Sequence, residues 1–297
     1  MQLGFIGLGS MGAPMAGNLL AAGHSLAVHA RRPEAMQDLV AAGASRCASP
    51  REVAARSEVI FTMVTDTAAV EEVTLGADGI AAGALPGSVL IDHSTISPSG
   101  ARRIATSLGA HGIHMLDAPV SGGCAGARTA TLSIMVGGDE DVFNRCRPLL
   151  ESLGTTVVYI GSAGAGQVAK ACNQICIVVN QLGAAEALLL AERSGVDFDR
   201  VQRAMMGGFA ASRILDVQGP KMMSRHFEGQ IESRLHHKDI LIALEMAREL
   251  GARLPASALA ADLLTRLQEA GGARLDSAAV FTILEQASRQ EPWEHAG

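Results

Sequence analysis

Lys170 carries an ammonium group that could donate a proton, and Asn173 stands three residues after it in a segment of helical periodicity. That spacing places both side chains on one face of a helix. The residues around Lys170 are apolar, so we expect its ammonium to be partly desolvated. Burial lowers the pKa of a lysine, which makes it a usable general acid near neutral pH. The alternative is a lysine that extends from a domain interface into water.

A second group of residues follows an expected strand, in the segment Asp117–Gly123. It contains the hydroxyl of Ser121 followed by Gly122 and Gly123, which leave their backbone N–H groups uncovered. Such a turn suits a small anion such as a carboxylate, and it lies at the sheet edge where α/β proteins bind ligands. A plain turn without a ligand is the alternative.

A glycine-rich segment follows the first expected strand, Leu3–Ile6, and a helical run comes directly after it. Its sequence GLGSMG, residues 7–12, has the Gly-x-Gly-x-x-Gly spacing of a dinucleotide-binding turn between strand and helix. Gly7 permits the tight turn, Gly9 lets the backbone approach a pyrophosphate, and Gly12 allows the helix to pack closely on the strand. The helix N-terminus offers its N–H groups to the phosphates. A glycine-rich turn without a ligand is the alternative.

The end of the second expected strand bears on the choice between NAD and NADP. A carboxylate about 20 residues after the glycines would bind the ribose hydroxyl of NAD. This chain instead has His29-Ala30-Arg31-Arg32, and the first carboxylate is Glu34. Because two guanidinium groups suit a 2′-phosphate, the sequence favours NADP(H) over NAD(H). The alternative is that both arginines are solvated loop charges.

The elements that must position these residues change character along the chain. Short β-branched runs alternate with helical patterns over the first 160 residues, which predicts a doubly wound, mostly parallel sheet, an α/β Rossmann domain. The expected strands are Leu3–Ile6, Ser25–His29, Val59–Val64, Ser88–Asp92, Ile113–Leu116, Leu132–Val136 and Thr156–Ile160. Afterwards only helical patterns recur, at 167–193, 198–206, 234–250, 256–270 and 277–288. We expect an NADP-binding domain over 1–162, an all-α domain over 163–297, and a long interdomain helix.

Composition narrows the class of partner. The 297 residues contain 24 Lys and Arg against 30 Asp and Glu, a net charge of −6, which argues against nucleic acid and anionic membrane surfaces. The five cysteines form no Cys-x-x-Cys pair, so we expect no metal site and reduced thiols. No basic region precedes the first apolar stretch, and polar residues interrupt the apolar run Ile175–Ala191. We therefore expect a cytoplasmic protein in which that run is a buried helix.

Several separated segments together resemble the β-hydroxyacid dehydrogenase family. They occur in the family's order between residues 4 and 239, and the helical remainder also fits. The segments are Gly4–Gly12, Asp117–Gly123, Thr131–Gly138, Gly164-x-Gly166-x-x-x-Lys170-x-x-Asn173, and Lys238-Asp239. The resemblance covers nearly the whole chain and implies an NAD(P)-dependent oxidoreductase of two domains.

The resemblance also implies roles for individual residues. It makes Lys170 the catalytic acid/base and Asn173 a residue that orients the substrate. It gives the substrate carboxylate to Ser121, Gly122 and Gly123. The cofactor contacts that it implies, beside the glycines at 7, 9 and 12, are Ser10, Met11, Met63, Val64, Thr65, Thr95 and Lys238.

The chain departs from the family pattern at a few positions. Gln174 stands where many relatives have a second Asn, Thr129-Ala130 precedes Thr131 where Gly is usual, and Cys124 follows the double glycine directly. These departures bear on substrate fit more than on the type of reaction. Arg31 and Arg32 stand where some relatives have an acidic residue, which again favours NADP.

The segment Met206–Leu215 is most similar to the family branch that reduces tartronate semialdehyde (2-hydroxy-3-oxopropionate) to D-glycerate in glyoxylate metabolism. Alternatives are 3-hydroxyisobutyrate or 4-hydroxybutyrate dehydrogenase, and glyoxylate or succinic semialdehyde reductase. A non-catalytic NADP-binding sensor is an alternative of another class, but it would not need Ser121, Lys170 and Asn173 together. Imine reductases generally lack the lysine. The long apolar helix predicts a homodimer or homotetramer through the helical domain.

Overall fold

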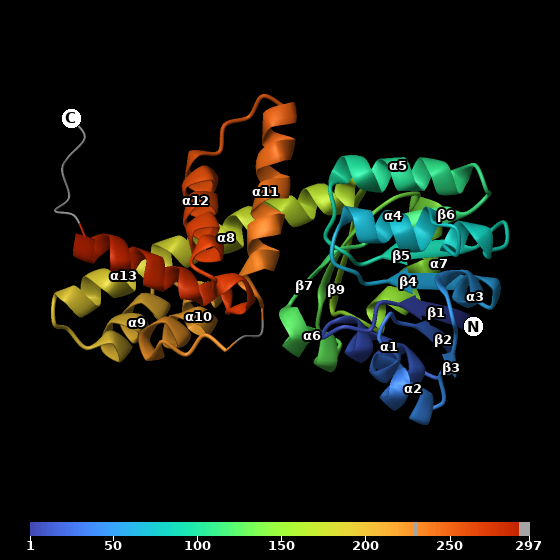
Figure 1. Ribbon diagram of the computed structural model, residues 1–297, viewed down its shortest axis with the longest axis horizontal. Coiled ribbons are helices and arrows are strands. Elements are labelled where there is room, and N and C mark those ends of the chain that lie inside the picture. The colour runs from blue at the N-terminus through green and yellow to red at the C-terminus, as the bar shows by residue number, and fades with distance from the viewer. Residues whose placement is uncertain (229–230, 291–297) are drawn as a thin grey trace. The chain divides into compact units, whose positions relative to one another are not determined.

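The computed structural model of the protein describes residues 1–228 and 231–290, and the chain forms two compact units, residues 1–170 and 171–297. The first unit is a sheet with helices on both faces, and the second is built from helices (Figure 1). Each unit has its own hydrophobic clusters. The expected class, a Rossmann domain followed by a helical domain and joined by a long helix, is confirmed.

The sheet of the first unit has the strand order β3-β2-β1-β4-β5-β6-β8-β7, with β9 paired to β8. Its strands are β1 (Gln2–Ile6), β2 (Ser25–His29), β3 (Ser45–Arg46), β4 (Val59–Thr62), β5 (Val89–Asp92), β6 (His114–Asp117), β7 (Val120–Ser121), β8 (Ser133–Gly137) and β9 (Thr156–Gly161). All pairings are parallel except those of β8 with β6 and β7. The seven expected strands are present, and the two-residue strands β3 and β7 were not predicted.

Strands β1, β2, β4, β5 and β6 are parallel, and their register aligns their carboxyl ends. Ile6 pairs with His29 of β2 and with Thr62 of β4, and Thr62 pairs in turn with Asp92, which pairs with Asp117. The last residues of β2, β1, β4, β5 and β6 therefore lie side by side, and the loops that follow them share one edge of the sheet. Ligands of doubly wound folds bind at this edge.

The two faces of the sheet are covered by different helices. Alternate strand residues enter opposite clusters, as the pleat requires: Phe61 packs on Phe5 in one cluster, and Ile60 belongs to the other. Helices α1 and α2 cover one face and α4 and α5 the other (Figure 1). The helices of this unit are α1 (Gly12–Ala21), α2 (Gln37–Ala41), α3 (Pro50–Ala55), α4 (Thr67–Leu75), α5 (Pro98–Gly109), α6 (Gly123–Thr129) and α7 (Glu140–Glu151), with 3-10 turns η1 (Pro33–Met36) and η2 (Ile80–Ala82).

A single helix, α8 (Ala165–Arg193), begins in the first unit and continues into the second. By length and composition this helix could cross a membrane. The sequence predicted only a buried helix for its apolar run. One such helix is weak evidence for a membrane span, because the core helix of a soluble protein can be equally long and apolar. In the most apolar 18-residue stretch of this helix, 44% is buried within the protein.

The helices of the second unit pack into two clusters around α8. After α8 come α9 (Phe198–Met206), α10 (Arg213–Ser224), α11 (Ser233–Glu249), α12 (Pro255–Glu269), η3 (Gly272–Arg274), η4 (Ser277–Ala279) and α13 (Val280–Gln290). Helix α10 was not predicted, because Pro220 interrupts its helical pattern. Leu215 and Met222 on this helix are buried in the core, and this packing holds the helix despite the proline.

Candidate functional site

The glycine turn after β1 has the geometry of a dinucleotide cradle. The N–H of Gly7 donates to the carbonyl of His29 at 3.1 Å, which holds the turn against the end of β2. A Cβ on Gly12 would lie 1.9 Å from the carbonyl oxygen of Gly7, whereas a Cβ on Gly9 would meet no heavy atom within 4 Å. Gly12 is therefore required for close packing, and Gly9 leaves open backbone over which a pyrophosphate fits. The residues present suit a dinucleotide cofactor.

The loops after β4 and β5 are tied to this turn. Met63 donates its N–H to the carbonyl of Ile6 at 3.0 Å, and the N–H of Val64 donates to Ser94 Oγ at 2.9 Å. Thr65 follows and is exposed, and Thr95 lies next to Ser94 on the loop after β5. The structure thus brings Met63, Val64, Thr65 and Thr95 to the same edge of the sheet as the glycine turn.

Arg31 and Arg32 follow β2 after one intervening residue, Ala30, and are both exposed. Because the carbonyl of His29 accepts the N–H of Gly7, the backbone of this segment starts beside the glycine turn. Two cations at this position are available to an anionic group on a dinucleotide bound there.

Asp117, the last residue of β6, connects the sheet to α8. Its Oδ1 accepts the N–H of Gly164 at 2.7 Å, and its Oδ2 accepts the N–H of Gln167 at 2.9 Å. Burial raises the pKa of Asp117 to about 6, and the backbone N–H donors oppose that shift. The carboxyl group therefore fixes where α8 begins, and with it the position of the side chains on the first turns of that helix.

Lys170 is buried on α8, with 6% of its surface exposed, which agrees with the expected desolvation and not with a lysine that extends into water. Its Nζ donates to the carbonyl of Val120 at 2.9 Å. That carbonyl directly precedes Ser121, so the ammonium lies at the start of the Ser121-Gly122-Gly123 turn. Gly122 has φ +132°, a conformation that favours glycine. The proton donor and the anion-binding turn predicted from the sequence are thus brought together.

Gln167 is a residue of this region that the sequence did not single out. It is 1% exposed, its Nε2 donates to the carbonyl of Ser94 at 2.8 Å, and its Oε1 accepts the N–H of Ile96 at 3.1 Å. The side chain clamps the loop that carries Thr95 to the helix that carries Lys170. A polar residue three positions before Lys170, on the same helix face, was the available signal.

The buried carboxyl group of Asp92 holds the loop after β5 in place through hydrogen bonds. Asp92 Oδ1 accepts from Thr62 Oγ1 at 2.7 Å and from the N–H of Ser94 at 3.1 Å. Burial raises the pKa of Asp92 to about 6. Burial also lowers the pKa of His93 to about 4, so this ring, which lies 2.6 Å from the carbonyl of Ala118 through Nδ1, is neutral at pH 7. Both side chains are fully buried.

The remaining predicted residues, Asn173 and Lys238, belong to the second unit. Asn173 lies one helical turn beyond Lys170 on α8, and its Nδ2 donates to Gln174 Oε1 at 2.8 Å. Gln174 Nε2 donates to Asp239 Oδ2 at 2.6 Å, and Lys238 Nζ lies 3.0 Å from Asp239 Oδ1. Asn173 and Lys238 are therefore linked to each other through two buried side chains.

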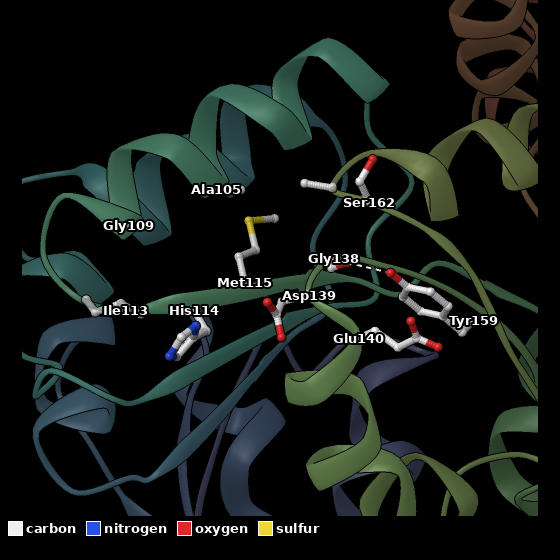
Figure 2. Close-up of a pocket in the computed structure, with 11 residues that line it drawn as sticks. Ala105, Gly109, Ile113, His114, Met115, Gly138, Asp139, Glu140, Tyr159 and Ser162 are labelled. Carbon is white, nitrogen blue, oxygen red and sulfur yellow. Dashed lines mark hydrogen bonds between the residues drawn. The ribbon is translucent and has the colours of Figure 1, made fainter.

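A separate surface pocket of about 490 Å³ opens between the end of α5, the start of β6, the start of α7 and the end of β9 (Figure 2). Tyr159 closes one side and donates its hydroxyl to the carbonyl of Gly138 at 3.0 Å. None of the predicted site residues lines this pocket. Within residues 1–228 and 231–290, no group of three or more His, Cys, Asp and Glu side chains is placed to hold a metal ion.

Two family models match the chain in succession. Residues 2–161 match the NAD binding domain of 6-phosphogluconate dehydrogenase, and residues 164–284 match the NAD-binding domain of NADP-dependent 3-hydroxyisobutyrate dehydrogenase. Together these segments include the glycine turn, Lys170 and the Lys238-Asp239 pair.

Individual proteins are similar over nearly the full length. The chain is 46% identical to 2-hydroxy-3-oxopropionate reductase of Escherichia coli over 285 residues, which are 96% of this chain and 97% of that one. It is 40% identical to 3-hydroxyisobutyrate dehydrogenase of Pseudomonas aeruginosa, covering 89% and 91%. Among solved structures, Mycobacterium tuberculosis 3-hydroxyisobutyrate dehydrogenase with L-serine superposes with a TM-score of 0.86 at 35% identity, covering 95% and 98%.

Proposed function

This chain belongs to the β-hydroxyacid dehydrogenase family of NAD(P)-dependent oxidoreductases, and from that premise we propose that it reduces tartronate semialdehyde to D-glycerate. One observation carries the proposal: the buried ammonium of Lys170 donates to the carbonyl of Val120 at 2.9 Å, at the start of the Ser121-Gly122-Gly123 turn. A proton donor beside a turn that suits a carboxylate fits a small acid that carries an aldehyde. The 46% identity to the Escherichia coli reductase supports the choice of substrate.

Substrate binding is assigned to the Ser121-Gly122-Gly123 turn and to Asn173 on α8. Ser121, Gly122 and Gly123 bind the carboxylate, because a hydroxyl and uncovered N–H groups together suit a small anion. Asn173, one turn beyond Lys170, orients the substrate. With the carboxylate fixed, the aldehyde oxygen is directed to the ammonium of Lys170.

Lys170 supplies the proton of the reaction. When bound, a nicotinamide cofactor would supply a hydride to the aldehyde carbon. As the C=O double bond opens, negative charge develops on its oxygen, and the ammonium stabilises that charge before it gives up its proton. The product is the primary alcohol of D-glycerate. The carbonyl of Val120 orients the ammonium of Lys170, because it accepts a hydrogen bond from one of the three N–H groups of that ammonium.

NADPH is the proposed reductant. The cradle is formed by Gly7, Gly9, Ser10, Met11 and Gly12, and the exposed Arg31 and Arg32 would bind the 2′-phosphate. The contacts assigned along the rest of the cofactor are Met63, Val64, Thr65, Thr95 and Lys238.

The division of labour between domains is also proposed. Residues 1–162 bind NADP, and residues 163–297 contribute to substrate binding and form a homodimer or homotetramer in the cytoplasm. Light scattering tests the assembly, and a single species of 30.7 kDa, the mass of one chain, would overturn it.

Initial rates with four aldehydes test the substrate and the cofactor together. Tartronate semialdehyde, glyoxylate, succinic semialdehyde and methylmalonate semialdehyde are each assayed with NADPH and with NADH. We expect the highest kcat/KM for tartronate semialdehyde with NADPH. A higher value for another semialdehyde would replace the substrate while leaving the role of Lys170, and a higher value with NADH would remove the role of Arg31 and Arg32.

Lys170→Ala tests the proton donor. We expect kcat to fall by about 10²–10⁴ fold, while the Kd of NADPH and the melting temperature stay close to those of the wild type. Small primary amines added to the assay should restore part of the rate, because they supply the missing acid. Near-normal turnover, or a loss that no amine restores, would refute the assignment.

A further inference from the structure

A continuous row of polar contacts runs from α11 to α8 within the second unit. Lys238 and Asp239 form an ion pair at 3.0 Å, Asp239 Oδ2 accepts from Gln174 Nε2 at 2.6 Å, and Gln174 Oε1 accepts from Asn173 Nδ2 at 2.8 Å. Gln174 is 3% and Asp239 6% exposed. Water therefore competes little for these groups, and each hydrogen bond in the row restricts the next.

The chemistry of these side chains determines which of them donates and which accepts at each hydrogen bond in the row. A carboxylate paired with an ammonium is ionised and can only accept hydrogen bonds, so the NH₂ end of Gln174 must face Asp239. The carbonyl end of Gln174 then faces Asn173, and a carbonyl accepts only a donor. The NH₂ end of Asn173 must therefore turn toward Gln174, which leaves the carbonyl oxygen Oδ1 of Asn173 directed elsewhere.

We propose that Asp239, acting through Gln174, holds Asn173 with its carbonyl oxygen toward the substrate, and that this acceptor selects substrates with a hydroxyl on the carbon next to the carboxylate. The proposal rests on the assignment of Asn173 to substrate binding. A hydroxyl on that carbon distinguishes tartronate semialdehyde from semialdehydes that lack it. Asp239 and Gln174 are positioning residues, because they act through Asn173.

The length of Gln174 is what makes the row continuous. An Asn side chain at this position would be one methylene shorter. From the same backbone position a shorter amide would not span both Asn173 and Asp239 at 2.8 and 2.6 Å. Gln174 is thus the residue that transmits the direction of the hydrogen bonds.

A pair of alcohols that differ only in this hydroxyl tests the proposal in the oxidation direction. D-Glycerate and 3-hydroxypropionate are each assayed with NADP⁺, and the ratio of their kcat/KM values is the measured quantity. We expect the wild type to favour D-glycerate by about tenfold or more, the worth of one good hydrogen bond. In Gln174→Leu this ratio should fall to within about threefold of unity, mainly through loss of D-glycerate turnover.

Two further variants separate direction from structure. Gln174→Glu combined with Asp239→Asn exchanges the amide and the carboxylate between the two positions. The carboxylate at position 174 still accepts a hydrogen bond from Asn173. The preference for D-glycerate should therefore return to within about threefold of the wild type. Gln181→Leu is the matched control. Gln181 is another buried glutamine, two turns further along α8, and neither of its amide atoms has a hydrogen-bond partner among the described residues. Its ratio should not change.

The outcomes distinguish this proposal from the proposed function. If the wild type prefers D-glycerate and Gln174→Leu lowers both kcat/KM values equally, the role of the row in selectivity is overturned while the proposed function stands. A double variant that stays as unselective as Gln174→Leu overturns the argument from hydrogen-bond direction. A wild type that prefers 3-hydroxypropionate overturns both proposals.

Discussion

Gly9 and Gly12 lie three residues apart in the cofactor turn, and replacing each with alanine should have opposite effects. In Gly12→Ala the new methyl group would lie 1.9 Å from the carbonyl oxygen of Gly7, about 1.5 Å closer than ordinary contact. In Gly9→Ala it would meet no heavy atom within 4 Å. The first change strains the folded protein, whereas the second fills only the space assigned to the pyrophosphate.

The magnitudes follow from what each methyl group meets. The neighbours of Gly12 are the backbone of Gly7 and the ring of Phe5, which cannot rotate away, so the cost is at the upper end of overpacking, about 3 kcal/mol. For a domain of this size that lowers Tm by about 6–12 °C. Gly9→Ala should leave Tm unchanged or raise it slightly, because it reduces the freedom of the unfolded chain by about 0.4–1 kcal/mol. Its NADPH affinity should fall by about tenfold or more.

Thermal unfolding by circular dichroism and NADPH binding by calorimetry measure the two effects separately. Gly183→Ala on α8 is the control, because that position also has open space within 4 Å but lies outside the cofactor turn. It should raise Tm slightly and leave the Kd of NADPH unchanged. The reasoning is refuted if Gly9→Ala binds NADPH as tightly as the wild type, or if Gly12→Ala melts within about 1 °C of it.

Three further predictions concern charges. The pKa of Asp92 is raised to about 6 in the folded protein, so its contribution to stability is present at low pH and is lost as the pH rises from about 4 to 6. Asp92→Asn should therefore be more stable than the wild type by about 1–3 kcal/mol at pH 7.5 and equal at pH 4 in urea titrations, and equal midpoints at both pH values would contradict this. Arg31→Ala and Arg32→Ala should each raise the KM of NADPH about tenfold and leave that of NADH within twofold, so parallel changes would show contact with a shared part of the cofactor. Asp117→Ala leaves two backbone N–H groups at the start of α8 without their acceptor and should cost about 2–4 kcal/mol, a prediction that a loss below about 1 kcal/mol in urea titrations would rule out.

The parts of the site that could be predicted depend on local patterns. The GLGSMG turn requires a strand before it and a helix after it, and both are visible as periodicity within 20 residues. Lys170 and Asn173 share a helix face because of their spacing alone. The strand ends could be placed together because parallel strands of similar length share one edge, which the register from Ile6 to Asp117 confirms.

The parts that could not be predicted depend on contacts between residues far apart in the chain. Gln167 bonds to groups 71 and 73 residues away, and Gln174 to Asp239 across 65 residues. No local pattern encodes those distances. Helix α10 was missed for a related reason, because its local signal contains Pro220 while its stability comes from tertiary burial of Leu215 and Met222.

The boundary between the two compact units falls between Lys170 and Ala171, inside α8. A cut there would break a helix in its first turns and leave up to about four carbonyls and four N–H groups without partners on the two sides. The units therefore cannot be exchanged between relatives as modules at that boundary. A chimera that joins one relative's cofactor unit to another's helical unit should be spliced before α8, in the turn at Gly161–Gly164, so that the helix is inherited whole from one parent.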